Sequence, residues 1–190
     1  MTLEIKASGL LGKAMIEAHL IQICFTVPDL DRGVRDFART AKAGPWFRVV
    51  PLAAAQDQTT HRGIPAPLGA DIALAYAGNT MYELVAPRAG SVSIFAEWVS
   101  RFGVGLHHFG FGTADFDGSL VEMKRSGKEP VMTSVTGRNA RVAMFESDGP
   151  MDALHELIEI RPESADFYTR LKRAAQGWTE DQGLYTDLAD

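Results

Sequence analysis

Four polar side chains occupy paired positions of an internal repeat, and together they would form a ligand set for a divalent cation. His108 opens a strand-like segment, and Gln22 holds the same place in a similar segment 86 residues earlier (108 − 22). Glu83 and Glu156 occupy matching positions in two later strand-like segments, each between apolar residues. A carboxylate is costly to bury there unless it is paired or bound to a cation. Imidazole, carboxylate and amide oxygen are ligands for Zn, Ni, Co, Mn or Fe.

The repeat extends beyond these four residues and predicts the architecture. Residues 22–31 align without a gap on residues 108–117, and the apolar stripe of the following helical segment keeps the same offset. Asp29 and Asp115 each precede such a segment and are suitable helix N-caps. A repeat of this kind indicates two similar structural units. We therefore predict two modules, each with the order β-α-β-β-β.

The first module is predicted to span residues 20–90, after a lead-in over 1–19. Its apolar periodicity indicates strands over 20–27, 46–50, 72–77 and 81–86 and a helix over 29–42. The distance from Glu83 to Glu156 is 73 residues, which is 13 fewer than the repeat offset (86 − 73). We place these 13 additional residues in segment 51–69, which contains three prolines and has no periodicity, and predict an inserted loop.

The second module is predicted to span residues 105–162. It follows a linker over 91–104 that contains a helix at 93–102, and it precedes a C-terminal helix and acidic tail over 163–190. The pattern indicates a helix over 115–126 and strands over 106–113, 130–135, 141–146 and 154–160.

The faces of the first strands follow from the alternation of side chains. Gln22 shares a face with Cys24, and His108 shares one with Gly110. The small residues behind the two polar ones would leave room for a ligand. The same alternation predicts that His107 points to the opposite face and is structural.

Composition narrows the classes of function. The net charge of −5 argues against a nucleic-acid partner, which would need a basic face. No run of 18 apolar residues is present, which predicts no membrane span, and the N-terminal residues do not have the pattern of a signal peptide. The single cysteine, Cys24, excludes an intrachain disulfide and fits a reducing compartment. We therefore expect a cytoplasmic protein.

Five phrases of the chain resemble one known family. The chain is similar, over residues 20–162, to the vicinal oxygen chelate superfamily of glyoxalases, bleomycin resistance proteins and dioxygenases, and nearest to its methylmalonyl-CoA epimerase-like and glyoxalase I-like members. The resemblance implies an α+β fold in which two tandem βαβββ modules form an open, cupped mixed sheet around a metal-binding cleft, with helices on the outside. It also implies a homodimer. The phrases are Gln-Ile-Cys-Phe-Thr-Val-Pro-Asp-Leu-Asp, Gly-Pro-Trp-Phe, Tyr-Glu-Leu-Val-Ala-Pro, Gly-Leu-His-His-Phe-Gly-Phe and His-Glu-Leu-Ile-Glu-Ile.

The resemblance also implies the roles of the four polar residues. In this superfamily the first and fourth strands of each module supply the metal ligands, which here are Gln22, Glu83, His108 and Glu156. This Gln/Glu/His/Glu set is similar to that of some glyoxalase I enzymes. Epimerases of the superfamily more often have histidine at the place of Gln22 and glutamine at the place of Glu83. Extradiol dioxygenases use two histidines and one glutamate, and Gln22 argues against that group.

These observations predict a divalent-metal-dependent enzyme that abstracts a proton next to a carbonyl through a metal-stabilised enolate or enediolate. Glu83 or Glu156 would take the proton. The expected substrate is a small carbonyl compound or thioester, and the outcome is that of an epimerase or other isomerase, or of a glyoxalase-type lyase. One alternative is a metal-free protein of the same fold that binds or sequesters a small molecule. Another is a transferase-like or dioxygenase relative with an altered metal.

Overall fold

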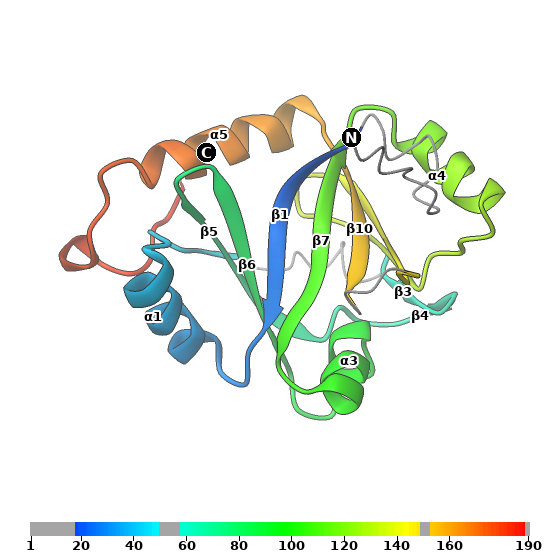
Figure 1. Cartoon of the computed structure of the whole chain (residues 1–190), viewed down its shortest axis with the longest axis horizontal. Coiled ribbons are helices and arrows are strands. Elements are labelled where there is room, and N and C mark those ends of the chain that lie inside the picture. Colours follow the sequence, from blue (N-terminus) through cyan, green and yellow to red (C-terminus); the bar gives the residue numbers. More distant parts are fainter. Residues whose placement is uncertain (1–17, 50–57, 149–152, 189–190) are drawn as a thin grey trace, which may run out of the picture.

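A computed structural model describes residues 18–49, 58–148 and 153–188 of the chain, which contain one curled sheet of ten strands and four α-helices (Figure 1). The two first strands of the predicted modules, β1 (His19–Thr26) and β7 (Gly105–Thr113), are antiparallel neighbours at the centre of the sheet. Each pairs in parallel on its other side with the last strand of its own module, β6 (Thr80–Pro87) or β10 (Leu154–Glu159). This topology confirms the predicted α+β fold class.

The outer strands complete the two halves in the same order. β5 (Ala70–Ala77) and then β2 (Phe47–Val49) follow β6 toward one edge. On the other side β9 (Arg141–Phe145) and then β8 (Met132–Val135) follow β10. Each half therefore has the β-α-β-β-β order that the periodicity predicts.

No helix within the described ranges combines the length and the apolar character that a membrane span requires.

The segment that follows β2 is not entirely a loop. Two short strands, β3 (Thr60–His61) and β4 (Ile64–Pro65), form a hairpin inside the predicted loop 51–69, whose residues 51–57 lie outside the described ranges. β3 pairs with β8, and the hydroxyl groups of Thr60 and Thr133 lie 2.7 Å apart. The insertion of the first module thus forms the sheet edge beside the second module. Local periodicity could not predict this, because the pairing partner lies about 70 residues away.

The register of the central pair shows that the repeat is also a structural symmetry. Gln22 pairs with Gly110, and His108 pairs with Cys24. The offset of 86 residues exchanges these two pairs, because it carries Gln22 to His108 and Cys24 to Gly110. A pseudo-twofold axis therefore passes between β1 and β7.

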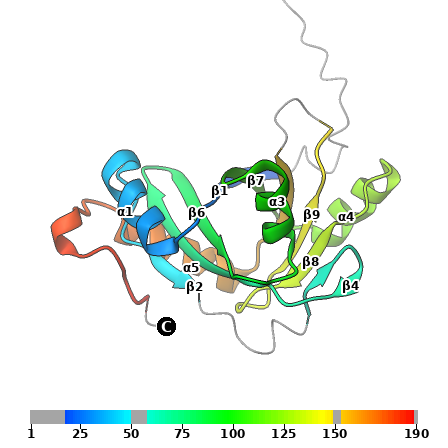
Figure 2. The same cartoon turned by 90° about the horizontal axis from the view of Figure 1, so that it is seen from below.

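The module helices cover the outer face of the sheet (Figure 2). α1 (Leu30–Ala41) begins at Asp29, whose carboxylate accepts a hydrogen bond from the backbone of Arg32, and it packs Val34 among buried outer-face residues of β5 and β6. α4 (Phe116–Arg125) begins at Asp115 in the same way and packs over β9 and β10. Both aspartates are the N-caps that the sequence predicts.

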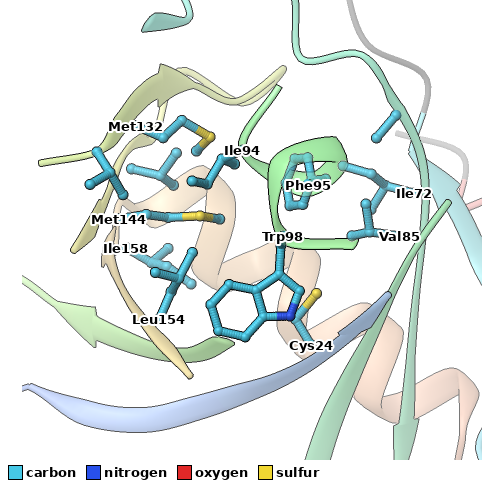
Figure 3. Close-up of a cluster of buried hydrophobic side chains, with 13 residues drawn as sticks. Cys24, Ile72, Val85, Ile94, Phe95, Trp98, Met132, Met144, Leu154 and Ile158 are labelled. Carbon is cyan, nitrogen blue, oxygen red and sulfur yellow. The ribbon is translucent and has the colours of Figure 1, made fainter. Parts of the chain in front are cut away.

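The other two helices cover the concave face. α3 (Ile94–Phe102) places Phe95 beside Ile72 and Val85, and Trp98 beside Cys24 (Figure 3). α5 (Pro162–Ala174) packs a different cluster on the inner side of β5 and β6. Their helical periodicity predicts both helices, but not that they would enclose the cleft. The members of the α5 cluster include Leu74, Tyr76, Met81, Phe167 and Leu171.

Candidate metal site

The four predicted ligand residues meet on the concave face of the four central strands. His108 Nε2 on β7 lies 3.1 Å from an Oε2 atom of both Glu83 on β6 and Glu156 on β10. Gln22 Nε2 on β1 lies 2.7 Å from Glu83 Oε2 and 3.2 Å from His108 Nε2. The strands that carry them are direct neighbours, so side chains of matching register come within contact distance.

The site is almost closed to solvent, and its charges are strongly coupled. Gln22, His108 and Glu156 are buried, and the Glu83 side chain is 12% exposed. Burial raises the pKa of Glu156, although His108 opposes this effect. Burial also opposes a charge on His108, but Cys24 and Glu156 together raise the pKa of His108 well above its ordinary value. A positive charge at Nε2 is therefore favoured, because this nitrogen faces two carboxylates.

The donor set fits a divalent cation. One donor atom from each of Glu83, His108 and Glu156 lies within 4.8 Å of the others, and the two carboxylates balance a charge of +2. The orientation of the Gln22 amide follows from its hydrogen bonds, and a half turn would direct its oxygen to the same place. In the metal-free protein a proton on His108 Nε2 lies between the carboxylates. A bound cation would occupy that position in place of the proton.

His107 lies on the same face as His108, so the prediction that it points away is wrong. The pairing steps from Cys24–His108 to Phe25–Leu106, which leaves His107 as an extra residue on β7. Such a β-bulge turns two successive side chains to one side of the strand. Strand alternation cannot reveal a bulge, because the extra residue is defined only against the partner strand.

The two histidines are in direct contact. His107 Nδ1 lies 2.8 Å from His108 Nδ1, and neither side chain is exposed to solvent. The His107 ring packs against α3, with ring centres 4.9 Å from Phe95 and 5.2 Å from Trp98. Burial, together with the charge of His108, holds the pKa of His107 well below its ordinary value. His107 is therefore neutral, and its Nδ1 can accept a hydrogen bond from His108.

Cys24 is buried beside His108 and Glu83, on the face that the sequence predicts. Burial raises the pKa of its thiol, so the sulfur is not a thiolate at neutral pH. It packs in the cluster of α3 as a small apolar side chain (Figure 3).

The space beside Gly110 does not hold a ligand, contrary to the prediction from its small size. A Cβ atom at Gly110 would lie 2.9 Å from both Gln22 Cβ and Ile158 Cδ1. The glycine therefore lets Gln22 and Ile158 pack closely over the strand. Open space lies elsewhere on the concave face, in a cavity of about 360 Å³ whose lining includes Gln22, Glu83 and Glu156.

Comparisons with known proteins agree with this fold. The family model described as glyoxalase/bleomycin resistance protein/dioxygenase superfamily matches residues 21–145, well over half of the chain. A hypothetical protein from Bacillus halodurans has a TM-score of 0.59 and 20% identity, over 76% of this chain and 95% of its own. No functionally curated protein shows significant sequence similarity to the chain.

Two solved structures of methylmalonyl-CoA epimerases are also similar. The epimerase from Mycobacterium tuberculosis has a TM-score of 0.58 and 19% identity, over 86% of this chain and 97% of its own. An epimerase in complex with methylmalonyl-CoA and NH4+ has a TM-score of 0.57 and 20% identity, over 76% of this chain and 96% of its own. At this identity the similarity establishes the fold, and the family model establishes the family. The chain belongs to the glyoxalase/bleomycin resistance protein/dioxygenase superfamily.

Proposed function

We propose that the chain is a divalent-metal-dependent enzyme that abstracts a proton from a carbon next to a carbonyl, as an epimerase or other isomerase or as a glyoxalase-type lyase. The observation that carries this proposal is the convergence of Glu83, His108 and Glu156, whose two acids line a cavity. Carboxylates that border a cavity and lie beside an imidazole are suited both to hold a cation and to move a proton.

Glu83, His108 and Glu156 would hold the metal, with Gln22 as the fourth ligand. When bound, the metal would act as a Lewis acid that stabilises negative charge on the substrate oxygen. The ion and the two carboxylates would balance in charge, which lowers the cost of burying the site.

Glu83 and Glu156 are the candidates for the proton transfer, and both border the cavity. One carboxylate would take the proton from carbon. The electron pair of the C–H bond would form the C=C bond of the enolate, and the π electron pair of the carbonyl would move to its oxygen. The other acid, in its protonated carboxylic acid form, would donate a proton to the opposite face and become the carboxylate, since the pseudo-twofold places the two acids on either side of His108. That outcome would be an epimerisation. Return of the proton to the neighbouring carbon would give the glyoxalase-type product.

His107 would act as a positioning residue for His108. If Nε2 of His108 binds a cation, the proton of its ring must be on Nδ1. His107 Nδ1, which lies 2.8 Å from His108 Nδ1, can accept the hydrogen bond of that proton. Histidine ligands of metals are commonly oriented by such a hydrogen bond, which sets the tautomer and the ring angle.

The structural neighbours support the epimerase version of this proposal only through their fold. Two of them are methylmalonyl-CoA epimerases in complex with methylmalonyl-CoA or with 2-nitronate-propionyl-CoA, which are thioester-type ligands.

A cytoplasmic homodimer remains our expectation for this chain, and light scattering after size exclusion tests its dimeric state.

The second candidate is a metal-free protein that binds a small molecule. The observation in its favour is that Gln22 already donates a hydrogen bond to Glu83, and that His108 forms ion pairs with Glu83 and Glu156. A protein without a metal would also need such contacts to bury these groups.

The first experiment measures metal per chain in protein purified without chelator, followed by addition of Zn, Ni, Co or Mn. We expect about one divalent ion per chain. His108→Ala should lose it, whereas His155→Ala, which changes a half-buried histidine on the outer side of β10, should retain it. Solvent deuterium exchange next to a carbonyl then tests the chemistry by NMR. Absence of metal under all these conditions would favour the binding protein.

A further inference from the structure

We propose that the substrate is a compact carbonyl compound with an apolar body, bound without a coenzyme A group. This inference rests on the proposed function, because the metal site would hold the carbonyl end. It deepens that function by assigning the rest of the substrate to the walls of the cavity.

The side walls of the cavity are apolar strand residues from both halves of the sheet. Ile72 and Leu74 on β5 contribute from one flank, and Met132 on β8, with Val142 and Met144 on β9, contributes from the other. The curl of the sheet turns these flanks toward each other (Figure 2). An apolar group between them would be removed from water on both sides, which is the main source of affinity in such a site.

The two helices on the concave face line further parts of the cavity. Phe167 and Tyr168 of α5 line the cavity, and the Phe167 ring lies 5.0 Å from that of Phe47 on β2. Phe95 of α3 lines another part of it. Aromatic residues from three elements therefore surround the space. A planar or branched apolar group would be contacted by ring faces and edges.

The charges along the cavity do not suit a phosphate-rich ligand. Among the described lining residues, the charged ones are Glu83, Glu156 and Arg138. The Arg138 guanidinium carbon lies 3.7 Å from the centre of the Phe167 ring, so this cation packs on the aromatic wall. Polyphosphate groups are usually bound by several cations or by helix N-termini. This cavity offers one stacked arginine and one residue from the first turn of α5, Ser164, whose hydroxyl already bonds to the backbone of Arg161.

The polar groups of the walls suit a ligand that carries few oxygens. The hydroxyl groups of Thr59 and Ser134 lie 2.7 Å apart and bond to each other. Burial raises the pKa of Tyr168, so its phenol stays neutral and can donate a hydrogen bond. The volume of about 360 Å³ is near the lower end of the range for small-molecule sites. A small carbonyl compound with an aromatic or branched aliphatic body fits these properties.

The test compares two chelating probes that differ only in their apolar body, benzohydroxamate and acetohydroxamate. Both are titrated into zinc-loaded protein by calorimetry, and propionyl-CoA is titrated as the rival ligand. We expect benzohydroxamate to bind at least about tenfold more tightly than acetohydroxamate, because its ring would be buried between the walls. We expect propionyl-CoA to bind more weakly than benzohydroxamate.

Two variants locate the effect in the cavity. Val49→Trp and Leu68→Trp each fill space along its lining and should reduce the preference for benzohydroxamate to about one. Val92→Trp makes the same change at an exposed residue, which is 71% accessible, and should leave the preference intact. Two lining variants are used so that a folding defect in one does not decide the result.

Each outcome has a definite meaning. A preference of about tenfold that the lining variants remove supports the inference. Equal binding of the two hydroxamates, or tighter binding of propionyl-CoA, overturns the inference but leaves the metal-dependent function standing. A protein that binds no zinc is loaded with Ni, Co or Mn and titrated again. A protein that binds none of the four metals overturns the proposed function, and this substrate class falls with it.

Discussion

The two modules have the same backbone plan but place different chemistry on it. Each has a β-bulge one residue before its first ligand position, at Ile21 in β1 and at His107 in β7. Ile21 packs as an apolar side chain against the cluster under α3. His107 occupies the equivalent place and contacts the ring of His108. The same distortion therefore fills space in one module, and in the other it places a second histidine against His108, the proposed metal ligand.

The proposed ligand positions also differ between the two modules. Both modules keep an acid on their last strand, Glu83 and Glu156, and the two carboxylates are 3.1 Å from the same nitrogen. At the first ligand position the second module has His108, a strong donor, while the first module has Gln22, a weak one. Pseudo-symmetry thus brings the four positions together, and their side chains predict that the second module contributes more to the proposed metal site.

The largest expected effects come from the two acids that symmetry makes equivalent. Glu83→Gln and Glu156→Gln each remove one carboxylate, and we expect deuterium exchange to fall by about 10²–10⁴-fold in the variant that loses the general base. Comparison of the two by NMR, at saturating metal, identifies that base. Glu159→Gln on β10 is the matched control, since Glu159 pairs with Arg141 outside the site. Unchanged exchange in both variants would contradict a role for either acid.

Substitutions at His108 and Gln22, the equivalent positions on β7 and β1, should show which module contributes more to the proposed metal site. His108→Gln is expected to lower metal affinity by about 100-fold or more, because a direct ligand should matter at least as much as an outer-shell partner. Gln22→Ala should cost about tenfold, since an amide is a weak ligand. Competition with a chromophoric chelator measures both. Equal losses would show that the two modules contribute equally.

The two bulges can be tested in the same way. His107→Phe keeps a ring against Phe95 and Trp98 but removes the acceptor for His108, and we expect metal affinity to fall by about 10–100-fold. His107→Asn should restore part of the affinity, because its side-chain oxygen can replace Nδ1. Ile21→Val is the control in the other module. A purely structural role for His107 would lower the melting temperature of the metal-free protein while leaving metal affinity unchanged.

The smallest expected effect is on the pH dependence of stability. The folded protein raises the pKa of His108, so its contribution to stability is fully present below the unfolded value of about 6.5 and is lost as pH rises through the folded pKa. The raised pKa of Glu156 acts in the same direction from a lower pH. With chelator present, we expect the melting temperature to fall as pH rises, by about 2–4 °C for each kcal/mol.

Added zinc should reverse this trend, because it binds the deprotonated ring and gains affinity as pH rises. His108→Gln should flatten the chelator curve, since the residue in the equivalent position of the first module, Gln22, does not titrate. A chelator-treated parent protein whose stability rises through this range would refute the assignment.

The order of residues along the chain was sufficient to predict those features of the fold that depend on residues close together in the sequence. The capping residues Asp29 and Asp115 predict where α1 and α4 begin, and both are confirmed. Gln22 and His108 could be matched because the segments around them are alike over ten residues. That match, with the two equivalent acids, was enough to predict which four side chains meet.

The rest depended on pairing between distant segments. The bulge that turns His107 inward exists only relative to β1, and β3 joins the second half because its partner on β8 is far away in the chain. The space at Gly110 is filled by Gln22 and Ile158 from two other strands.

The sequence by itself therefore determined the modules, their order and the four polar residues that converge, because a repeat and its periodicity are local properties. Only the tertiary structure decided that α3 and α5 enclose the concave face, that His107 contacts His108, and that the cavity is apolar. The physical reason is that burial and contact belong to surfaces made by several elements at once. Such surfaces exist only after the sheet has curled and its helices have packed against it.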